Sequence, residues 1–389
     1  ATVVNDTQID FANSTVRGAL SATATTGNIT QGGALNILGA TTLVTTGQGA
    51  TIDLTTTTNA FTGELLITTN DNNTPADGTY AAHASIDGGT TNLIIGTSTI
   101  DGNLTLLSGG TITDTASSTV TVKGDLNATT DANNSDITLD GLEVGGAYIL
   151  NPHGTGVVTI VNAAGIDFVA MTVDGALSAT ATTGNITQSG ALTITGTTTL
   201  VTSADNGTID LKVNSIVNAF TGKLLITTND TGSETDGDVE IDGGTTNLIL
   251  GASTIDGDLT LRSGGTITDD GIATVRGTLT ATTDQSDKII TLDELAVTGA
   301  FTLAPDGTGA VTIVNAAGLN LAASTMGGTF SGTATTGNIS DSGTLAITGT
   351  TTLVTSADDA TITLDDTSNA FTGALTITTN DSSGTDSDA

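Results

Sequence analysis

The stretch GTSTIDGNLTLLSGGTITD, residues 96–114, alternates apolar and polar residues in short runs that Gly, Asn or Asp interrupt. Leu104 and Leu106 stand two residues apart, and in an extended strand such residues point to the same side. Thr and Ile also favour strands, because a branched Cβ fits a pleated surface better than a helix. The stretch therefore predicts short β-strands joined by tight turns.

The chain is built from a long repeat. The opening stretch returns as GASTIDGDLTLRSGGTITD from Gly251, and GNIT at Gly27 returns at Gly184 and, as GNIS, at Gly337. These spacings define three units, the last of them partial: 1–157, 158–310 and 311–389. We expect one continuous solenoid and not separate globular domains, and the break in mid-pattern predicts a segment of a longer array or filament.

Composition selects the kind of all-β fold. The chain has 389 residues with 50 Gly, but only three Pro, 2% aromatic residues and no Trp. An array of immunoglobulin-like sandwiches would need core aromatics and units of about 100 residues. A parallel β-helix needs only narrow apolar side chains in ladders, with about three short strands per turn. We therefore expect an all-β parallel β-helix of roughly 15–18 turns, with essentially no helix.

Three motifs carry a family resemblance that covers essentially the whole chain: GNITQSGALTITGTTTLVTSADNGTIDL (184–211), NAFTG, and GTSTIDGNLTLLSGGTIT (96–113). They resemble the repeats of filamentous-haemagglutinin-like exoproteins, giant bacterial surface proteins also described as β-strand-repeat proteins. The resemblance implies a right-handed parallel β-helix that is secreted or displayed at the cell surface. It also implies that the chain acts as a fibre or an adhesin stalk.

The net charge of the chain excludes some classes of binding partner. The chain carries 41 Asp and Glu against seven Lys and Arg, a net charge of −34, and only five of the acids are Glu. Such a surface repels nucleic acid and anionic membranes, whereas it can attract divalent cations. There is no Cys, which excludes disulfides and thiol chemistry. No apolar segment is long enough to span a membrane as a helix.

An acidic loop follows the ITTND motif of the second unit, in the sequence NDTGSETDGDVEID. Calcium prefers about six to eight hard oxygen ligands, which closely spaced carboxylates can supply. The loop matches neither the EF-hand nor the calcium β-roll pattern, and a solvated acidic bulge fits it as well. The candidate calcium ligands are Asp230, Glu234, Asp236, Asp238, Glu240 and Asp242.

The residues give little support for catalysis. His83 lies in an insertion that the second unit lacks, and His153 aligns with Asp306. Carbohydrate-active β-helix enzymes place carboxylates and a basic residue on one face. Of the seven basic residues here, only Lys123 and Arg276 occupy equivalent positions. We expect no catalytic residue and no cofactor other than calcium.

The NAFTG motif occurs once per unit. The charged position that follows it holds Glu64, then Lys223, then Ala374, which argues against a binding site. We expect the aromatic ring of the motif to seal the interior at a widened corner. These structural repeat marks are Phe61, Phe220 and Phe371.

Together these features predict a structural extracellular fibre or adhesin stalk, outside or on the surface of a prokaryotic cell. The expected partners are copies of the chain, joined end to end or laterally, or a host or matrix surface. Two alternatives stay open. One is a calcium- or glycan-binding surface module that acts through the acidic loops, and the other is a carbohydrate-active β-helix enzyme.

Overall fold

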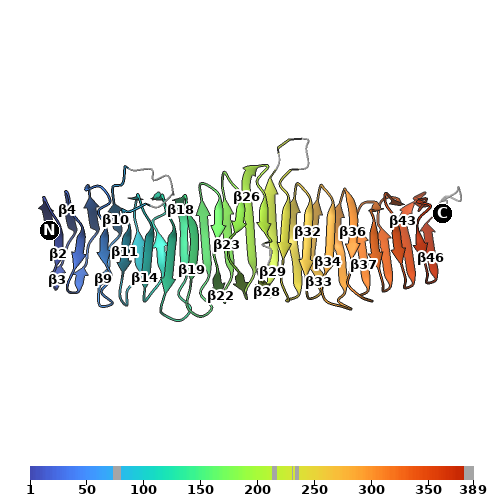
Figure 1. The fold of residues 1–389 in the computed structure, drawn as a ribbon, viewed down its shortest axis with the longest axis horizontal. Helices are drawn as coiled ribbons and strands as arrows, with labels where there is room; N and C mark the ends of the chain where they lie inside the picture. The colour runs from blue at the N-terminus through green and yellow to red at the C-terminus, as the bar shows by residue number, and fades with distance from the viewer. Residues whose placement is uncertain (73–79, 213–216, 230, 233–235, 381–389) are drawn as a thin grey trace. The chain divides into compact units, whose positions relative to one another are not determined.

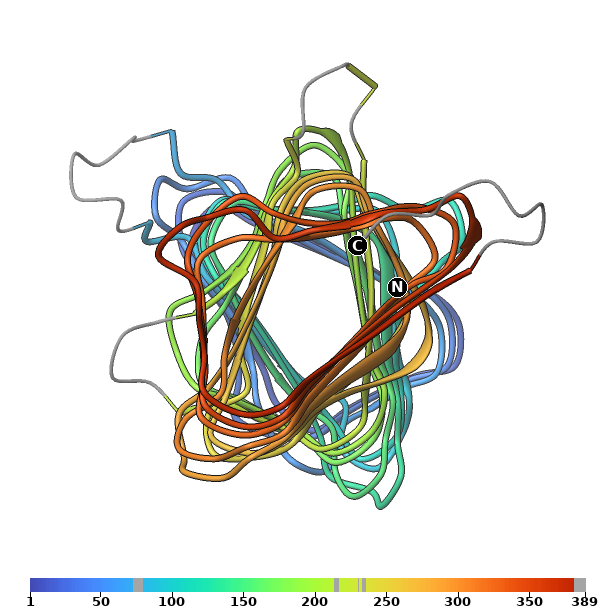
Figure 2. The ribbon, with the colours of Figure 1, turned by 90° about the vertical axis from the view of Figure 1, so that its right-hand side faces the viewer.

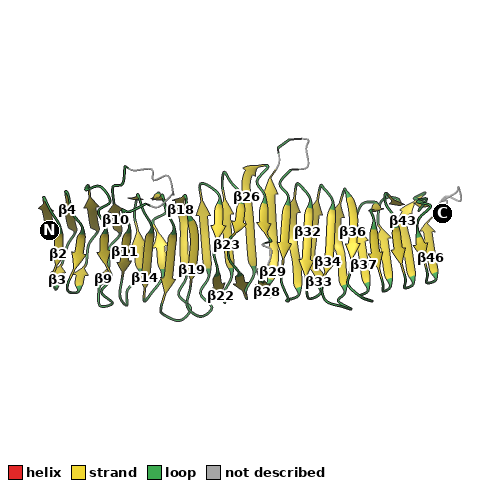
Figure 3. Cartoon of the chain, in the orientation of Figure 1, coloured by secondary structure: helices red, strands yellow, loops and turns green. Residues whose placement is uncertain are grey.

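The computed structural model consists of parallel β-strands stacked as a β-solenoid of about 17 turns, with about three strands per turn (Figures 1 and 3). The described residues are 1–72, 80–212, 217–229, 231–232 and 236–380. None of them is helical, so the predicted all-β parallel β-helix is confirmed. Within the same residues no helix has the length and apolarity that a membrane span requires. Two compact units divide the chain, Ala1–Gly196 and Thr197–Ala389.

The first compact unit has three faces. Face A contains β1 (Thr2–Asn5), β4 (Leu20–Ala24), β7 (Thr41–Thr45), β10 (Leu65–Thr68), β12 (Leu93–Ile95), β13 (Ser98–Ile100), β15 (Ile112–Asp114), β16 (Val120–Val122), β18 (Ile137–Val144), β20 (Val158–Asn162) and β23 (Leu177–Ala181). Face B contains β2 (Ile9–Phe11), β5 (Ile29–Gln31), β8 (Ile52–Leu54), β11 (Ala84–Asp87), β14 (Leu104–Ser108), β17 (Leu126–Thr130), β19 (Ala147–Asn151), β21 (Ile166–Phe168) and β24 (Ile186–Gln188). The remaining strands belong to separate small sheets, which we group under the name face C. One sheet contains β3 (Ser14–Val16), β6 (Leu35–Ile37) and β9 (Ala60–Phe61), and another contains β22 (Met171–Val173) and β25 (Leu192–Ile194).

The second compact unit repeats this plan. Its face A contains β26 (Thr198–Asp205), β29 (Lys223–Asn229), β31 (Leu248–Ile255), β33 (Ile267–Val275), β35 (Ile290–Val297), β37 (Val311–Asn315), β40 (Phe330–Ala334), β43 (Thr351–Asp358) and β46 (Leu375–Asn380). Its face B contains β27 (Ile209–Leu211), β30 (Val239–Asp242), β32 (Leu259–Ser263), β34 (Leu279–Thr283), β36 (Ala300–Ala304), β38 (Leu319–Leu321), β41 (Ile339–Asp341) and β44 (Ile362–Thr363). Its face C contains β28 (Ala219–Phe220), β39 (Ser324–Met326), β42 (Leu345–Ile347) and β45 (Ala370–Phe371).

The register of β14 shows how the alternating sequence fills the interior. Leu104 and Leu106 pair with Leu126 and Ala128 of β17 in the next turn. All four side chains are buried, while the polar residues between them are half-buried on the outer side. Each fully buried Leu contributes about 1.5–3 kcal/mol by leaving water. Within each unit, successive turns enclose a common interior (Figure 2). Side chains such as these fill it.

A five-residue strand, buried at its first, third and fifth positions, changes face along the chain. In the first compact unit it lies in face A as β4 and β7, then in face B as β14 and β17, then in face A again as β20 and β23. In the second unit it lies in face B as β32 and β34, then in face A as β37 and β40. The same pattern therefore occupies the two faces in turn.

Glycines form the corners between faces A and B. Gly124 N donates a hydrogen bond to the carbonyl oxygen of Gly102 at 3.1 Å, and Gly146 N donates to that of Gly124 at 3.0 Å. A Cβ atom at Gly146 would lie 2.5 Å from the carbonyl carbon of Gly124. The corners of successive turns thus approach too closely for any side chain.

Candidate functional site

A side-chain acceptor follows the corner glycine in several turns. In the second unit, Gly277 N donates to the carbonyl oxygen of Gly257 at 3.1 Å. This carbonyl is therefore already engaged by the residue before Thr278. Thr278 N donates instead to Oδ1 of Asp258 at 2.6 Å. Asp258 N donates in the same way to Oδ1 of Asp238 at 2.8 Å. The carboxylate supplies the acceptor that the backbone does not offer at this corner.

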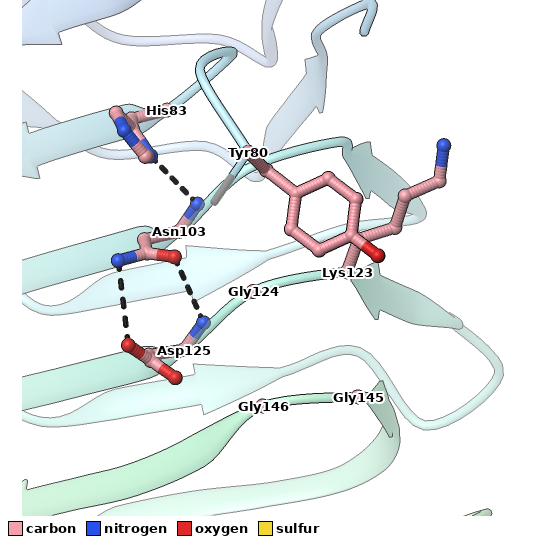
Figure 4. A pocket seen from close by; sticks show the side chains of 8 residues that line it. All are labelled: Tyr80, His83, Asn103, Lys123, Gly124, Asp125, Gly145 and Gly146. Atoms are coloured by element: carbon pink, nitrogen blue, oxygen red, sulfur yellow. Dashed lines mark hydrogen bonds between the residues drawn. The ribbon is translucent and has the colours of Figure 1, made fainter. Parts of the chain in front are cut away.

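The first unit has the same arrangement with different residues (Figure 4). Asn103 N donates to Nδ1 of His83 at 2.9 Å, and Asp125 N donates to Oδ1 of Asn103 at 3.0 Å. Ala147 N donates in turn to Oδ1 of Asp125 at 2.9 Å. These side chains form a column in which each residue accepts a backbone hydrogen bond from the following turn.

We call His83, Asn103, Asp125, Asp238 and Asp258 the corner acceptors. In the repeat, His83 takes the position of Asp238, and Asn103 takes that of Asp258. The expectation that His83 lies in an insertion absent from the second unit is therefore wrong. An imidazole nitrogen, an amide oxygen and a carboxylate oxygen can all accept a hydrogen bond. What recurs at these positions is therefore an acceptor atom and not a negative charge.

Two further carboxylates each hold a pair of backbone nitrogens. Asp269 accepts from the nitrogens of Asp293 and Glu294 at 3.1 and 2.8 Å. Asp114 accepts two backbone hydrogen bonds in the same manner in the first unit, at 3.1 and 2.7 Å. Burial raises the pKa of both carboxyl groups, and the backbone hydrogen bonds oppose this only in part. These acids also join one turn to the next.

Three of the predicted calcium ligands are spread along β30 and the residue before it. Asp238, Glu240 and Asp242 alternate with buried residues, and such outward neighbours on a strand start about 7 Å apart. Each already has a partner. Asp238 is a corner acceptor, Glu240 forms an ion pair with Lys212, and Asp242 accepts from Gly244 N at 2.8 Å.

Of the remaining calcium candidates, only Asp236 lies within the described residues. Asp236 is exposed, while Asp230 and Glu234 lie outside the described residues. In the described ranges, no group of three or more His, Cys, Asp or Glu side chains could hold a metal ion. The calcium site therefore stays a prediction, and the four described acids do not converge on one point.

Lys123 and Arg276, the basic residues at equivalent positions, each pair with an Asp of the preceding turn. Lys123 Nζ lies 2.9 Å from Oδ1 of Asp101, and Arg276 Nη1 lies 3.5 Å from Oδ1 of Asp256. The backbone nitrogen of Asp71 donates to the other oxygen of Asp101 at 2.8 Å. Partly exposed ion pairs contribute about 0–1 kcal/mol. Their recurrence fits turn-to-turn pairing, which needs no acid–base chemistry.

The NAFTG motif contains an asparagine that the repeat pattern did not single out. Asn59 is 2% exposed, and its Nδ2 donates to the carbonyl oxygens of Leu54 and Asp87 at 3.2 and 3.0 Å. Its Oδ1 accepts from Leu35 N at 2.9 Å, and its amide also exchanges hydrogen bonds with that of Gln31 at 2.8 and 2.9 Å. One buried amide thus links three turns, and its recurrence in every copy of the motif was the available signal.

The aromatic rings of the motif lie in face C. Phe61 and Phe220 are 1% and 0% exposed, so both rings belong to the interior. Phe371 is half-buried. It belongs to β45, against which no later strand packs in the described part of the chain.

The two histidines occupy unrelated positions. His83 is a corner acceptor, half-buried, and its Nδ1 bonds to a backbone nitrogen and not to a carboxylate or hydroxyl. His153 is exposed in a turn, where its backbone nitrogen donates to Oγ1 of Thr130 at 3.0 Å. Neither arrangement is that of a nucleophile activated by a general base.

An open groove of about 540 Å³ lies beside the column of corner acceptors in the first unit (Figure 4). Three of the residues that line the groove are glycines, which expose only backbone to it: Gly124, Gly145 and Gly146. Its walls carry an aromatic ring and polar groups: Tyr80, His83, Asn103, Lys123 and Asp125. The sequence pattern did not group these residues, since they come from four successive turns.

Comparison with known protein families gives five matches along the chain. A family described as repeats of unknown function (DUF5649) matches residues 1–68, 81–150, 155–227, 236–305 and 308–378. No curated protein and no solved structure matches the chain.

The matches show that each long sequence unit holds two copies of a shorter repeat. Consecutive copies place their five-residue strands in face A and then in face B, because one copy makes about three and a half turns. The full sequence pattern therefore returns only after two copies. The five matches cover most of the chain, and the chain belongs to this family of repeats.

Proposed function

We propose that the chain is a structural segment of an extracellular fibre or adhesin stalk of a prokaryotic cell, and that it is not an enzyme. Its tandem repeats form a β-solenoid, as structural repeat proteins do. The recurring polar residues support this role, because they join one turn to the next. The resemblance to filamentous-haemagglutinin-like exoproteins supports the location at the cell surface.

One observation carries the proposal. Asn103 and Asp258 occupy the same position of the repeat and accept the same backbone hydrogen bond, at 3.0 and 2.6 Å. A carboxylate that acts as a general acid, a general base or a nucleophile must be able to ionise, so Asn would not replace it. A position that only needs an acceptor oxygen accepts both residues.

The charge suggests how such a segment associates. A net charge of −34 opposes non-specific clumping and contact with nucleic acid. We therefore expect specific contacts, either with further copies joined end to end or laterally, or with a host or matrix surface.

Two experiments test the proposal. Negative-stain electron microscopy of the purified chain should show elongated particles or filaments, and compact round particles would contradict the structural role. Protease treatment of intact cells should remove the chain from the surface while a cytoplasmic marker survives. Full protection of the chain until the cells are lysed would contradict the extracellular location.

A further inference from the structure

The groove of the first unit differs from the repeating scaffold around it. At the positions of His83, Asn103 and Asp125 the second unit has Asp238, Asp258 and Thr278. Its stretch 231–238, TGSETDGD, contains no counterpart of Tyr80. Two of the scaffold contacts are kept in the second unit, because Asp238 and Asp258 still accept their backbone hydrogen bonds. The fold therefore does not require His83 and Asn103 at these positions.

The fold does not require a glycine at position 145, which lines the groove, either. A Cβ atom there would meet its nearest neighbour, the carbonyl oxygen of Lys123, at 3.1 Å, and the second unit has Thr298 at this position. At Gly146, by contrast, a Cβ atom would lie 2.5 Å from backbone. The scaffold tolerates a side chain at position 145, and its absence leaves the groove open.

The groups that face the groove have free hydrogen-bonding capacity. Nδ1 of His83 accepts from Asn103 N, so the neutral imidazole carries its proton on Nε2 and can donate it to a ligand. The hydroxyl of Tyr80 has no hydrogen bond to any described residue. Asp125 accepts one hydrogen bond at Oδ1 from Ala147 N and one long hydrogen bond of 3.5 Å at Oδ2 from Nδ2 of Asn103, so its carboxylate can accept further hydrogen bonds.

We propose that this groove binds a neutral saccharide. The half-buried ring of Tyr80 offers a flat apolar face for a pyranose ring, and its hydroxyl offers a polar edge. Asp125 accepts hydrogen bonds from sugar hydroxyls, while Nε2 of His83 donates one (Figure 4). The volume lies within the range of about 300–1,000 Å³ that small-ligand sites occupy.

Charge selects a neutral sugar over an acidic one. The ammonium group of Lys123, the one cation of the groove wall, is paired with Asp101. Asp125 and the net charge of −34 repel anions. The site goes beyond the structural role and does not depend on it, so a failure to bind sugar leaves the proposed stalk unaffected.

Tyrosine fluorescence gives a direct test, because the chain has no Trp and only two Tyr. In a Tyr148→Phe background, Tyr80 is the single fluorophore. Maltotriose, cellotriose, chitotriose and mannotriose are titrated to millimolar concentration, with saturation-transfer NMR in parallel. At least one should change the fluorescence and receive saturation, and trigalacturonate should bind more weakly.

Three variants separate the groove from other surfaces. Gly145→Thr copies the second unit, and His83→Asp keeps the corner acceptor but removes the Nε2 donor. These two variants and Tyr80→Ala should weaken binding by about tenfold or more while the circular dichroism spectrum is unchanged. Glu64→Ala, a change that the third sequence unit (311–389) already carries as Ala374, should leave binding unaltered. Absence of binding for all four sugars, or binding that survives all three groove variants, overturns the proposal.

Discussion

Thr278 N donates a hydrogen bond of 2.6 Å to Oδ1 of Asp258, twenty residues earlier in the chain and one turn away. The preceding corner carbonyl, that of Gly257, is already used by Gly277. The carboxylate of Asp258 therefore takes the place of a backbone carbonyl as the hydrogen-bond acceptor for Thr278 N. The abundance of Asp and Asn at such corners has a structural reason that needs no ligand.

The first prediction concerns this acceptor. Asp258→Asn should leave the free energy of unfolding nearly unchanged, because an amide oxygen can take the place of the carboxylate oxygen. Asp258→Ala should lower it by about 1 kcal/mol, since Thr278 N loses its partner. Urea unfolding followed by circular dichroism measures both. Equal losses in the two variants would mean that the charge matters and not the acceptor.

Two glycines at the corners between faces C and A give a second prediction with a matched control. A Cβ atom at Gly39 would lie 2.7 Å from the backbone of Gly18, whereas a Cβ atom at Gly18 would meet nothing within 4 Å. Gly39→Ala should lower the free energy of unfolding by about 1–3 kcal/mol. Gly18→Ala, at the equivalent corner one turn earlier, should be neutral or slightly stabilising. Similar unfolding curves for the two variants would refute the close approach of the corners.

The third prediction exploits a buried hydroxyl. Tyr148 is fully buried, burial raises the pKa of its phenol, and its hydroxyl has no hydrogen-bond partner among the residues that the structure describes. The equivalent residue of the second unit is Phe301. Tyr148→Phe should therefore raise the free energy of unfolding by about 1 kcal/mol, and Phe301→Tyr should lower it by a similar amount.

Calorimetric or chemical unfolding of these two single variants measures both changes. A loss of stability in Tyr148→Phe would show that the hydroxyl has a partner, for example a water molecule, and would contradict the prediction.

A fourth prediction concerns pH. Burial raises the pKa values of Asp114 and Asp269, so the folded state binds protons more tightly than the unfolded chain. Stability should increase as the pH falls from neutral through these raised values towards the unfolded value of about 3.9. Hydrogen bonds from Thr308 lower the pKa of Asp287, so its stabilising contribution is present above about pH 3.9 and lost below it.

These opposing effects predict a maximum of stability at about pH 4–5. Urea unfolding at a series of pH values locates it. The double variant with Asp114→Asn and Asp269→Asn should show a shallower rise between neutral pH and the maximum. A steady loss of stability from pH 7 to pH 5 in the unaltered chain would be incompatible with raised pKa values at these two carboxyls.

The fifth prediction concerns calcium. Three of the described acids of the 230–242 loop, Asp238, Glu240 and Asp242, already have partners, and no group of three acids in the described residues could hold a metal ion, so we expect weak binding at most. Calorimetric titration with calcium should give little heat, and Asp236→Asn combined with Asp238→Asn should not alter the unfolding temperature in calcium. A large calcium-dependent stabilisation that this double variant abolishes would establish the site.

The sequence was sufficient for the architecture because the alternation that defines strands is local. Leu104 and Leu106 are both buried, as their spacing requires. The shorter repeat was missed for a physical reason. One copy ends about half a turn out of phase, so the next copy meets different neighbours, and its residues diverge.

The candidate site was less accessible to sequence reasoning. Each corner acceptor bonds to a residue about twenty positions away, and that partner depends on where each turn closes. The sequence therefore indicated a metal ligand at Asp238 and gave no sign that His83 accepts a backbone hydrogen bond. The groove is lined by residues from four successive turns. A pattern within one short stretch of sequence cannot show that these residues lie side by side.

Hydrogen exchange at a single amide tests the central claim most directly. In the unaltered chain, the backbone amide of Thr278 should exchange slowly although its side chain is exposed, because Asp258 holds it. It should remain protected in Asp258→Asn and exchange about tenfold faster in Asp258→Ala, with the amide of Leu279 as the internal reference. Equal exchange of the Thr278 amide in all three proteins would contradict the claim that side-chain acceptors hold successive turns together.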